Sequence, residues 1–140
     1  MKRMLVVLLS VLMALMAFCA WAEEAEPTVY KSGYWQYVLL EDGTAEIYDY
    51  FNYSTKDLTI PETIDGHMVT AIGDEAFYWC RSLTSITIPD SVTAIGANPF
   101  RSCAELTDII VSPDHPTLAT IDGVLFDKVE KTLICYPYAY

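Results

Sequence analysis

Basic residues are scarce in this sequence. Lysine and arginine together number 8 against 19 aspartates and glutamates, and the formal net charge at pH 7 is −11. Proteins that bind nucleic acids or anionic membrane surfaces need clusters of positive charge. The composition therefore argues against both classes of partner.

Motifs of catalysis are missing as well. The sequence has no G-x-S-x-G nucleophile turn, no H-E-x-x-H zinc motif, no glycine-rich phosphate loop and no calcium loop of the D-x-D-x-D-G type. Its two histidines, His67 and His115, fall in segments that resemble loops, where we expect solvated side chains. These absences predict a protein that is not an enzyme and that holds no metal or cofactor.

Long hydrophobic runs are confined to the N-terminus. Met4 to Phe18 is almost wholly apolar, follows two basic residues and precedes the small-x-small sequence Ala20-Trp21-Ala22. This is the pattern of a secretory signal peptide, whereas a membrane-spanning helix needs about 20 apolar residues. We expect residues 1–22 to be removed by cleavage after Ala22, leaving residues 23–29 as an acidic spacer. An uncleaved N-terminal anchor is the alternative.

Cysteine is also rare. The part of the chain after residue 22 contains Cys80, Cys103 and Cys135. An odd number of cysteines cannot all pair within one chain. The chain is therefore no disulfide-stapled miniprotein, and a core of ordinary aliphatic side chains must stabilise it.

What the sequence does contain is a repeat. The segment VTAIG occurs at residues 69–73 and again at 92–96, and the residues around it recur at the same offset of 23. Between Pro61 and Ile72 the first copy carries five extra residues around Ile64–His67. A period in the low twenties is typical of a leucine-rich solenoid. The pairs related by the offset of 23 are Ile72 and Ile95, Phe77 and Phe100, Cys80 and Cys103, Leu83 and Leu106, Ile86 and Ile109, and Ile88 and Val111.

A third copy follows, and its second half slips by three residues. Ile121 then answers Ile95, Phe126 answers Phe100, and Val129 takes the place of Cys103 as an apolar substitute. Ile134 to Pro137 resembles the start of a fourth strand. At this end, either Val124–Phe126 and Thr132–Tyr136 form a hairpin that closes the stack, or the edge of the last coil is bare. Residues 57–140 are thus predicted to form about three coils.

The repeat predicts its own local structure. In Leu83-x-x-Ile86-x-Ile88 the alternation points two isoleucines inward from a short strand, and Pro89 ends the pairing because it has no N–H. We expect turns at Gly73 and Gly96, a short helical turn opened by Asp74-Glu75, and Phe77 and Phe100 as plugs at the back of the coils. No coil can bury its apolar side alone, so the coils must stack. The predicted fold class is an α/β solenoid, mostly β, with a period of about 23 residues.

Cys80 and Cys103 occupy equivalent positions on successive coils. Stacking at strand spacing would place them about 5 Å apart. Side chains that point the same way fit disulfide geometry poorly, so we expect buried free thiols that act as small hydrophobic groups, with a disulfide as the alternative.

The pattern L-x-x-I-x-I-P-x-x-V-x-x-I-G-x-x-A-F-x-x-C resembles the BspA-like leucine-rich repeats of bacterial surface proteins. The resemblance spans Asp57 to about Pro137, and Ile121–Pro137 resembles a variant unit of that family. It implies an exported chain that binds proteins, with adhesion to host matrix in some members, and it brings no catalytic residues. The residues that carry it are Leu83, Ile86, Ile88, Pro89, Val92, Ile95, Gly96, Phe100 and Cys103, and in the preceding copy Ile72, Gly73, Ala76, Phe77 and Cys80.

Residues 30–56 are predicted to form an N-terminal β-hairpin around Asp42-Gly43. A two-residue loop would place Trp35 opposite Tyr50 and Tyr37 opposite Tyr48. We expect the aliphatic face to cap the first coil. The aromatic residues would either stabilise the sheet as cross-strand pairs or form a binding patch. The aromatic face carries Trp35, Tyr37, Tyr48 and Tyr50, and the aliphatic face Val38, Leu40, Ala45 and Ile47.

The outward strand positions Ser85, Thr87, Asp108 and Ile110 form a second candidate binding surface, although small polar residues are also usual on a solvated sheet. Our leading hypothesis is a secreted or cell-surface, adhesion-like module that binds a protein, with host or matrix proteins among the candidates. The alternative is a truncated or modular structural fragment of a larger repeat protein. Such a fragment would need further repeats or would self-associate through its open C-terminal edge.

Overall fold

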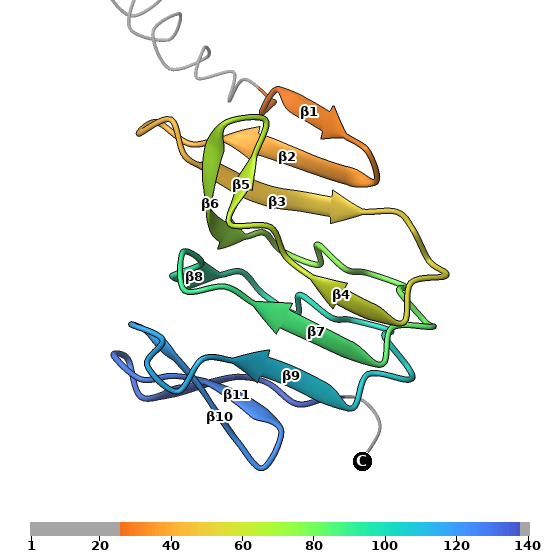
Figure 1. Ribbon diagram of the computed structural model, residues 1–140, viewed down its shortest axis with the longest axis vertical. Coiled ribbons are helices and arrows are strands. Elements are labelled where there is room, and N and C mark those ends of the chain that lie inside the picture. Colours follow the sequence, from red (N-terminus) through yellow and green to blue (C-terminus); the bar gives the residue numbers. More distant parts are fainter. Residues whose placement is uncertain (1–25, 138–140) are drawn as a thin grey trace, which may run out of the picture.

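The computed structural model describes residues 26–137, and these residues form twelve β-strands and no helix. The strands stack along the long axis of the molecule, with β1 at one end and β10 and β11 at the other (Figure 1). The predicted signal peptide lies outside the described residues. The strands are β1 (Val29–Ser32), β2 (Trp35–Leu39), β3 (Ala45–Tyr50), β4 (Asp57–Thr59), β5 (Thr63–Ile64), β6 (His67–Ile72), β7 (Ser85–Ile88), β8 (Ala94–Ile95), β9 (Asp108–Val111), β10 (Leu118–Ile121), β11 (Val124–Asp127) and β12 (Thr132–Cys135).

Two parallel ladders hold the repeats at the predicted offset. In the sheet β4-β7-β9, Ser85 pairs with Asp108. In the second ladder β8 pairs with β6, so that Ile72 lies beside Ile95. Both offsets are 23 residues, which confirms the stacking of successive copies. Ile47 of β3 lies beside Ile72 on the other side, so β3 continues the second ladder as a further rung.

A column of aromatic rings fills the back of the stack. The rings of Phe77 and Phe100 stack with centroids 5.4 Å apart, as the repeat predicts. Tyr50 and Trp35 extend the column, with centroids 6.1 and 6.3 Å from that of Phe77. Cys80 and Cys103 are buried and unpaired beside the column, as expected, and the Cys103 thiol donates to the carbonyl of Phe77.

The segment after Gly73 is a series of turns, so the predicted helical turn at Asp74-Glu75 is wrong, and the α component of the predicted fold class is absent from residues 26–137. The reason lies in the backbone hydrogen bonds. The N–H groups of Glu75, Phe77 and Trp79 donate to carbonyls of the next coil at 2.9–3.0 Å, so they cannot donate within a helix. Glu75 also has a φ of 52°, outside the helical region.

The glycines of VTAIG are required by close approach between coils. Neither Gly73 nor Gly96 has a positive φ. A Cβ on Gly96 would lie 2.6 Å from the backbone N of Asp74, and one on Gly73 would lie 3.0 Å from the carbonyl O of Ile47. The glycine therefore recurs because the coil beside it leaves no room for a side chain.

The N-terminal hairpin forms, but its predicted register holds only at its open end. Trp35 faces Tyr50, whereas a bulge after Gln36 places Tyr37 opposite Ile47. A bond from Leu40 N to Thr44 O closes a longer loop, in which Gly43 has a φ of 80°. The two-residue turn at Asp42-Gly43 is therefore wrong. The extra loop residue shifts every pair near the turn by one.

The five extra residues of the first copy lie in the hairpin β5–β6, with the Asp65-Gly66 turn at its tip. The Asp65 carboxylate accepts hydrogen bonds from Ser32 Oγ at 2.8 Å and from Tyr37 OH at 3.0 Å. His67 Nδ1 donates to the carbonyl of Gly43 at 2.9 Å. The insertion therefore ties the first coil to the N-terminal strands, and His67 is no free loop residue.

The third copy departs from the predicted pattern after β9. Asp122-Gly123 forms a tight turn with φ values of 51° and 79°, so β10, β11 and β12 fold into an antiparallel sheet. The assignments of Ile121 and Val129 to the core are wrong, because these side chains are 60% and 64% exposed. The alternative closing hairpin of Val124–Phe126 with Thr132–Tyr136 is correct in outline, and a parallel fourth strand does not form.

His115 is fully buried, contrary to the expectation of a solvated loop residue. Its Nδ1 accepts from the N–H groups of Thr117 and Leu118 at 3.2 and 3.0 Å, and its Nε2 donates to the carbonyl of Pro89 at 3.2 Å. Lys128 donates to the carbonyl of His115. The imidazole thus joins the third coil to the end of β7, and its role is structural.

The aromatic column gives a direct test of the stack. We expect Phe77→Ala to destabilise the protein by about 3–5 kcal/mol, because it removes a buried ring between two others. Val129→Ala, at the exposed position that the repeat assigned to the core, should change stability by less than about 0.5 kcal/mol. Denaturant unfolding followed by circular dichroism measures both, and equal losses would contradict the observed packing.

Candidate functional site

Between residues 26 and 137 no three His, Cys, Asp or Glu side chains are grouped to hold a metal ion, and no helix there could cross a membrane. Burial raises the pKa of the Cys135 thiol to about 12, so its thiolate is scarce at neutral pH. Both histidines are engaged in the structural hydrogen bonds described above.

Four of the predicted site residues come together on the outer side of the sheet β4-β7-β9. The register aligns Asp57, Ser85 and Asp108 in one column, and Thr59, Thr87 and Ile110 in the next. We call these six outward side chains the sheet face. Ile110 is 49% exposed, although it lies between the buried Ile109 and the partly buried Val111. The pleat explains this, because successive strand residues point to opposite sides.

A groove of about 600 Å³ adjoins the sheet face where the three strands end. Pro61, Pro89 and Pro113 lie along it, one from each coil, and Thr59, Thr87 and Ile110 of the sheet face also line it. We call it the proline groove. Its charged lining residues are Glu62 and Asp90, and no basic residue lines it. The sheet face and the groove together form an acidic surface with an exposed isoleucine.

The aromatic residues of the hairpin do not form an open patch. Tyr37 and Tyr50 are buried in the core, and Trp35 packs against that core. Only Tyr48 of this set is well exposed. The bulge after Gln36 and the insertion hairpin bury Tyr37, whereas Trp35 and Tyr50 pack on Phe77. The spacing within the hairpin alone could not have shown these contacts.

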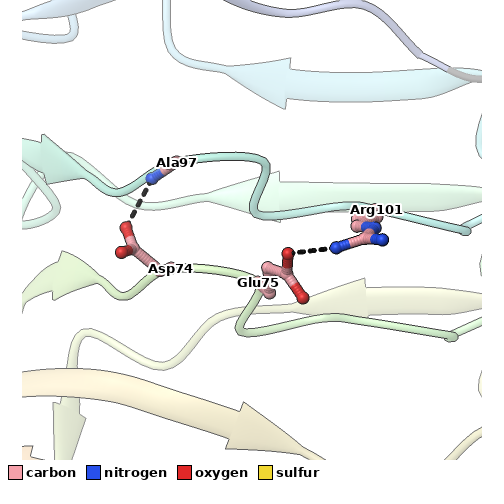
Figure 2. Close-up of polar contacts among 4 residues, drawn as sticks. All are labelled: Asp74, Glu75, Ala97 and Arg101. Carbon is pink, nitrogen blue, oxygen red and sulfur yellow. Dashed lines mark hydrogen bonds and ion pairs between the residues drawn. The ribbon is translucent and has the colours of Figure 1, made fainter.

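Tyr48 lines a separate pocket of about 480 Å³ together with Glu46, Asp74 and the two close-approach glycines. Partial burial and the charge of Asp74 raise the pKa of the Glu46 carboxyl. Asp74 accepts a hydrogen bond of 2.6 Å from the N–H of Ala97 on the next coil (Figure 2). This carboxylate is therefore part of the contact between coils.

Sequence reasoning missed one exposed cluster, formed by Tyr78, Trp79, Arg81 and Arg101. The signal was present in the repeat: the offset of 23 aligns Trp79 with Ser102, a large aromatic residue with a small polar one. Because the residue type at this position differs between the two copies, core packing does not determine it.

Residues 31–134 match the BspA type leucine rich repeat region, with 6 copies. The chain belongs to this family. The match begins within β1, so the leucine-rich repeat extends upstream of Asp57 and includes the hairpin, in agreement with the parallel pairing of β3 and β6. Protein binding is the general role of leucine-rich repeats, and such families are typically not enzymes.

Solved leucine-rich repeat proteins of bacteria share the fold. A leucine rich cell surface protein of Faecalibacterium prausnitzii is 32% identical, with a TM-score of 0.57 over 66% of this chain and 26% of that protein. A leucine-rich repeat protein of Bacteroides capillosus is 31% identical, with a TM-score of 0.54 over 60% of this chain and 65% of that one. The T. pallidum leucine rich repeat protein is 31% identical, with a TM-score of 0.54 over 63% of this chain and 41% of that one. The chain thus spans only part of the length of these relatives, and no curated protein matches it.

The raised pKa of Glu46 predicts a pH-dependent stability. A carboxyl whose pKa is higher in the folded state binds protons more readily there, so its contribution to stability falls as pH rises above the usual value of 4.5. We expect Glu46→Gln to stabilise the protein at pH 7 by at most about 1 kcal/mol, because solvent screens a half-exposed carboxylate. The gain should vanish as pH falls below 4.5.

Urea unfolding of both proteins across this pH range measures the difference. Glu41→Gln, on the exposed β2–β3 loop, is the matched control. A gain from Glu46→Gln that does not change with pH would show that the carboxylate is not the cause.

Proposed function

We propose that this leucine-rich repeat chain is an exported module that binds a protein partner through the sheet face and the proline groove, and that it performs no chemistry. The observation that carries the proposal is the alignment of outward side chains from three coils in one exposed surface beside a groove. Export is supported by the N-terminal signal-peptide pattern and by the cell-surface relative. Adhesion to a host or matrix protein fits this setting.

The surface chemistry favours a basic partner with an apolar side chain. Asp57 and Asp108 belong to the sheet face, Glu62 and Asp90 line the groove, and no basic residue lies among them. Complementary charge speeds association and rejects partners of the same sign. Ile110 offers the apolar contact, and the small Ser85 and Thr87 beside it leave room for an extended segment.

The test is binding to a synthetic peptide library in which lysine, arginine and apolar positions are varied. We expect basic peptides with an apolar residue to bind, and we expect Ile110→Asp to weaken that binding at least about tenfold, as truncation of an interface anchor does. Ile121→Asp is the matched control, because Ile121 is similarly exposed but lies on the C-terminal sheet. Surface plasmon resonance measures both, and equal affinities would rule out the sheet face.

A second candidate function is self-association through the C-terminal edge, as a structural unit. β12 is an edge strand of the sheet β10-β11-β12, and Leu133 and Tyr136 are exposed on it or directly after it. Open edge strands with apolar residues promote pairing between chains.

Sedimentation at increasing concentration tests this candidate. If the edge pairs, the chain assembles as its concentration rises, and Leu133→Lys keeps it monomeric, because a charged edge residue opposes pairing. A chain that stays monomeric at every concentration excludes self-association and leaves the binding module.

A further inference from the structure

The cluster of Tyr78, Trp79, Arg81 and Arg101, which we call the aromatic–arginine cluster, alternates rings and cations. The guanidinium of Arg81 lies 3.7 Å from the centroid of the Trp79 ring. The rings of Trp79 and Tyr78 are 5.7 Å apart, and Arg101 of the next coil lies 5.6 Å from the Tyr78 ring. Both rings are exposed, so the cluster forms a continuous surface on the segment between β6 and β7 and on the coil beside it.

Trp79 has an unusual backbone conformation for so large a residue. Its φ is 66°, in the left-handed region that bulky side chains rarely adopt. Ser102, at the equivalent position of the next coil, has a φ of 64°. The turn therefore needs this conformation, but it does not need an indole.

The indole of Trp79 contacts Tyr78 and Arg81 but lies outside the core. It is 44% exposed and does not belong to the hydrophobic core. A strained residue that adds nothing to the core is a reason to look for a binding role. In the next coil the small polar Ser102 fills the same turn, so the indole at position 79 is not needed for the turn to form.

Arg81 supplies the charge of the cluster. Its guanidinium forms no hydrogen bond or ion pair with any residue between 26 and 137, although the sequence holds 19 acidic residues. A guanidinium that lies over an indole and has no hydrogen-bond partner can bind a carboxylate through two parallel hydrogen bonds. Arg101 is held in place by Glu75 at 2.6 Å across the two coils (Figure 2).

We propose that the aromatic–arginine cluster is a second protein-binding site, which takes an acidic segment of a partner. A carboxylate of that segment binds the edge of Arg81, and an apolar side chain next to it packs on Tyr78 and Trp79. Tryptophan, tyrosine and arginine are the residues in which binding energy concentrates at interfaces. The remaining negative charge of the chain does not prevent this contact, because salt screens it beyond about 8 Å. The cluster shares no residue with the sheet face, which carries the opposite charge.

The probe is a fluorescein-labelled random copolymer of glutamate and tyrosine, and its binding is followed by fluorescence anisotropy. We expect the copolymer to bind more tightly than polyglutamate, because it offers rings as well as carboxylates. Trp79→Ser and Arg81→Ala should each weaken binding at least about tenfold, as losses at interface anchors do. Arg81→Lys should weaken it too, since lysine keeps the charge but loses the planar pair of donors. Lys31→Ala, which removes a positive charge from the distant strand β1, should leave it unchanged.

Thermal unfolding separates a binding role from a structural one. Trp79→Ser should melt at or above the temperature of the wild type, because serine occupies the same turn in the next coil. The proposal would be overturned if Trp79→Ser melted at a lower temperature and lost binding while Arg81→Ala still bound the copolymer normally. Trp79 would then be a structural residue.

Other outcomes are equally decisive. No binding of the copolymer up to millimolar concentration, or equal binding by all variants, would overturn the site. If heparin bound more tightly than the copolymer and the same variants weakened its binding, the ligand would be a sulfated polysaccharide. The proposal of a protein segment would then be wrong. Ile110→Asp should leave copolymer binding unchanged, so failure of this site and failure of the sheet face can be told apart.

Discussion

The structure depends on backbone hydrogen bonds between one coil and the next. In the turns, the N–H groups of Glu75, Phe77 and Trp79 donate to carbonyls of the following coil, and in the strands the parallel ladders do the same. Each bond fixes the offset between coils at one repeat, so equivalent side chains must lie in columns. The stacked phenylalanines, the aligned isoleucines and the glycines that admit a neighbouring backbone all follow from that single constraint.

The same constraint explains how such a fold can bind. Columns place outward residues of successive coils side by side, so a surface arises without any dedicated loop. Inward positions must be repeated faithfully, because each packs on its own equivalent. Outward positions can differ from coil to coil, as Ile110 differs from Thr87 and Trp79 from Ser102. The departures from the repeat, rather than the repeat itself, therefore give this chain its own surface chemistry.

The sequence predicted the parts of the fold that depend on the repeat, and it failed where contacts are not local. The offset of 23 gave the register of β6 with β8 and of β7 with β9. The Asp42-Gly43 pair misled, because it sits in a longer loop that shifts the hairpin register, and the tight turn at Asp122-Gly123 was not predicted. The burial of His115 depends on Pro89 of another coil, and that of Tyr37 on the insertion hairpin. Of the candidate site, the strand alternation gave the shared side of Ser85, Thr87, Asp108 and Ile110, of which Asp108 and Ile110 are exposed and the other two half-buried. Their role in binding stays a prediction.

Net charge and local chemistry act over different distances on this surface. A chain with a net charge of −11 attracts basic partners to every face, but that field falls off within about 8 Å at physiological ionic strength. In the proposed binding mode, attraction between opposite charges speeds the arrival of a basic segment, and direct contacts in the groove beside Ile110 hold it. The aromatic–arginine cluster receives no help from the field, since its cations are outnumbered. Any affinity it has must come from direct contact with the rings and the guanidinium edge, which is why the geometry of Trp79 and Arg81 matters more there than charge alone.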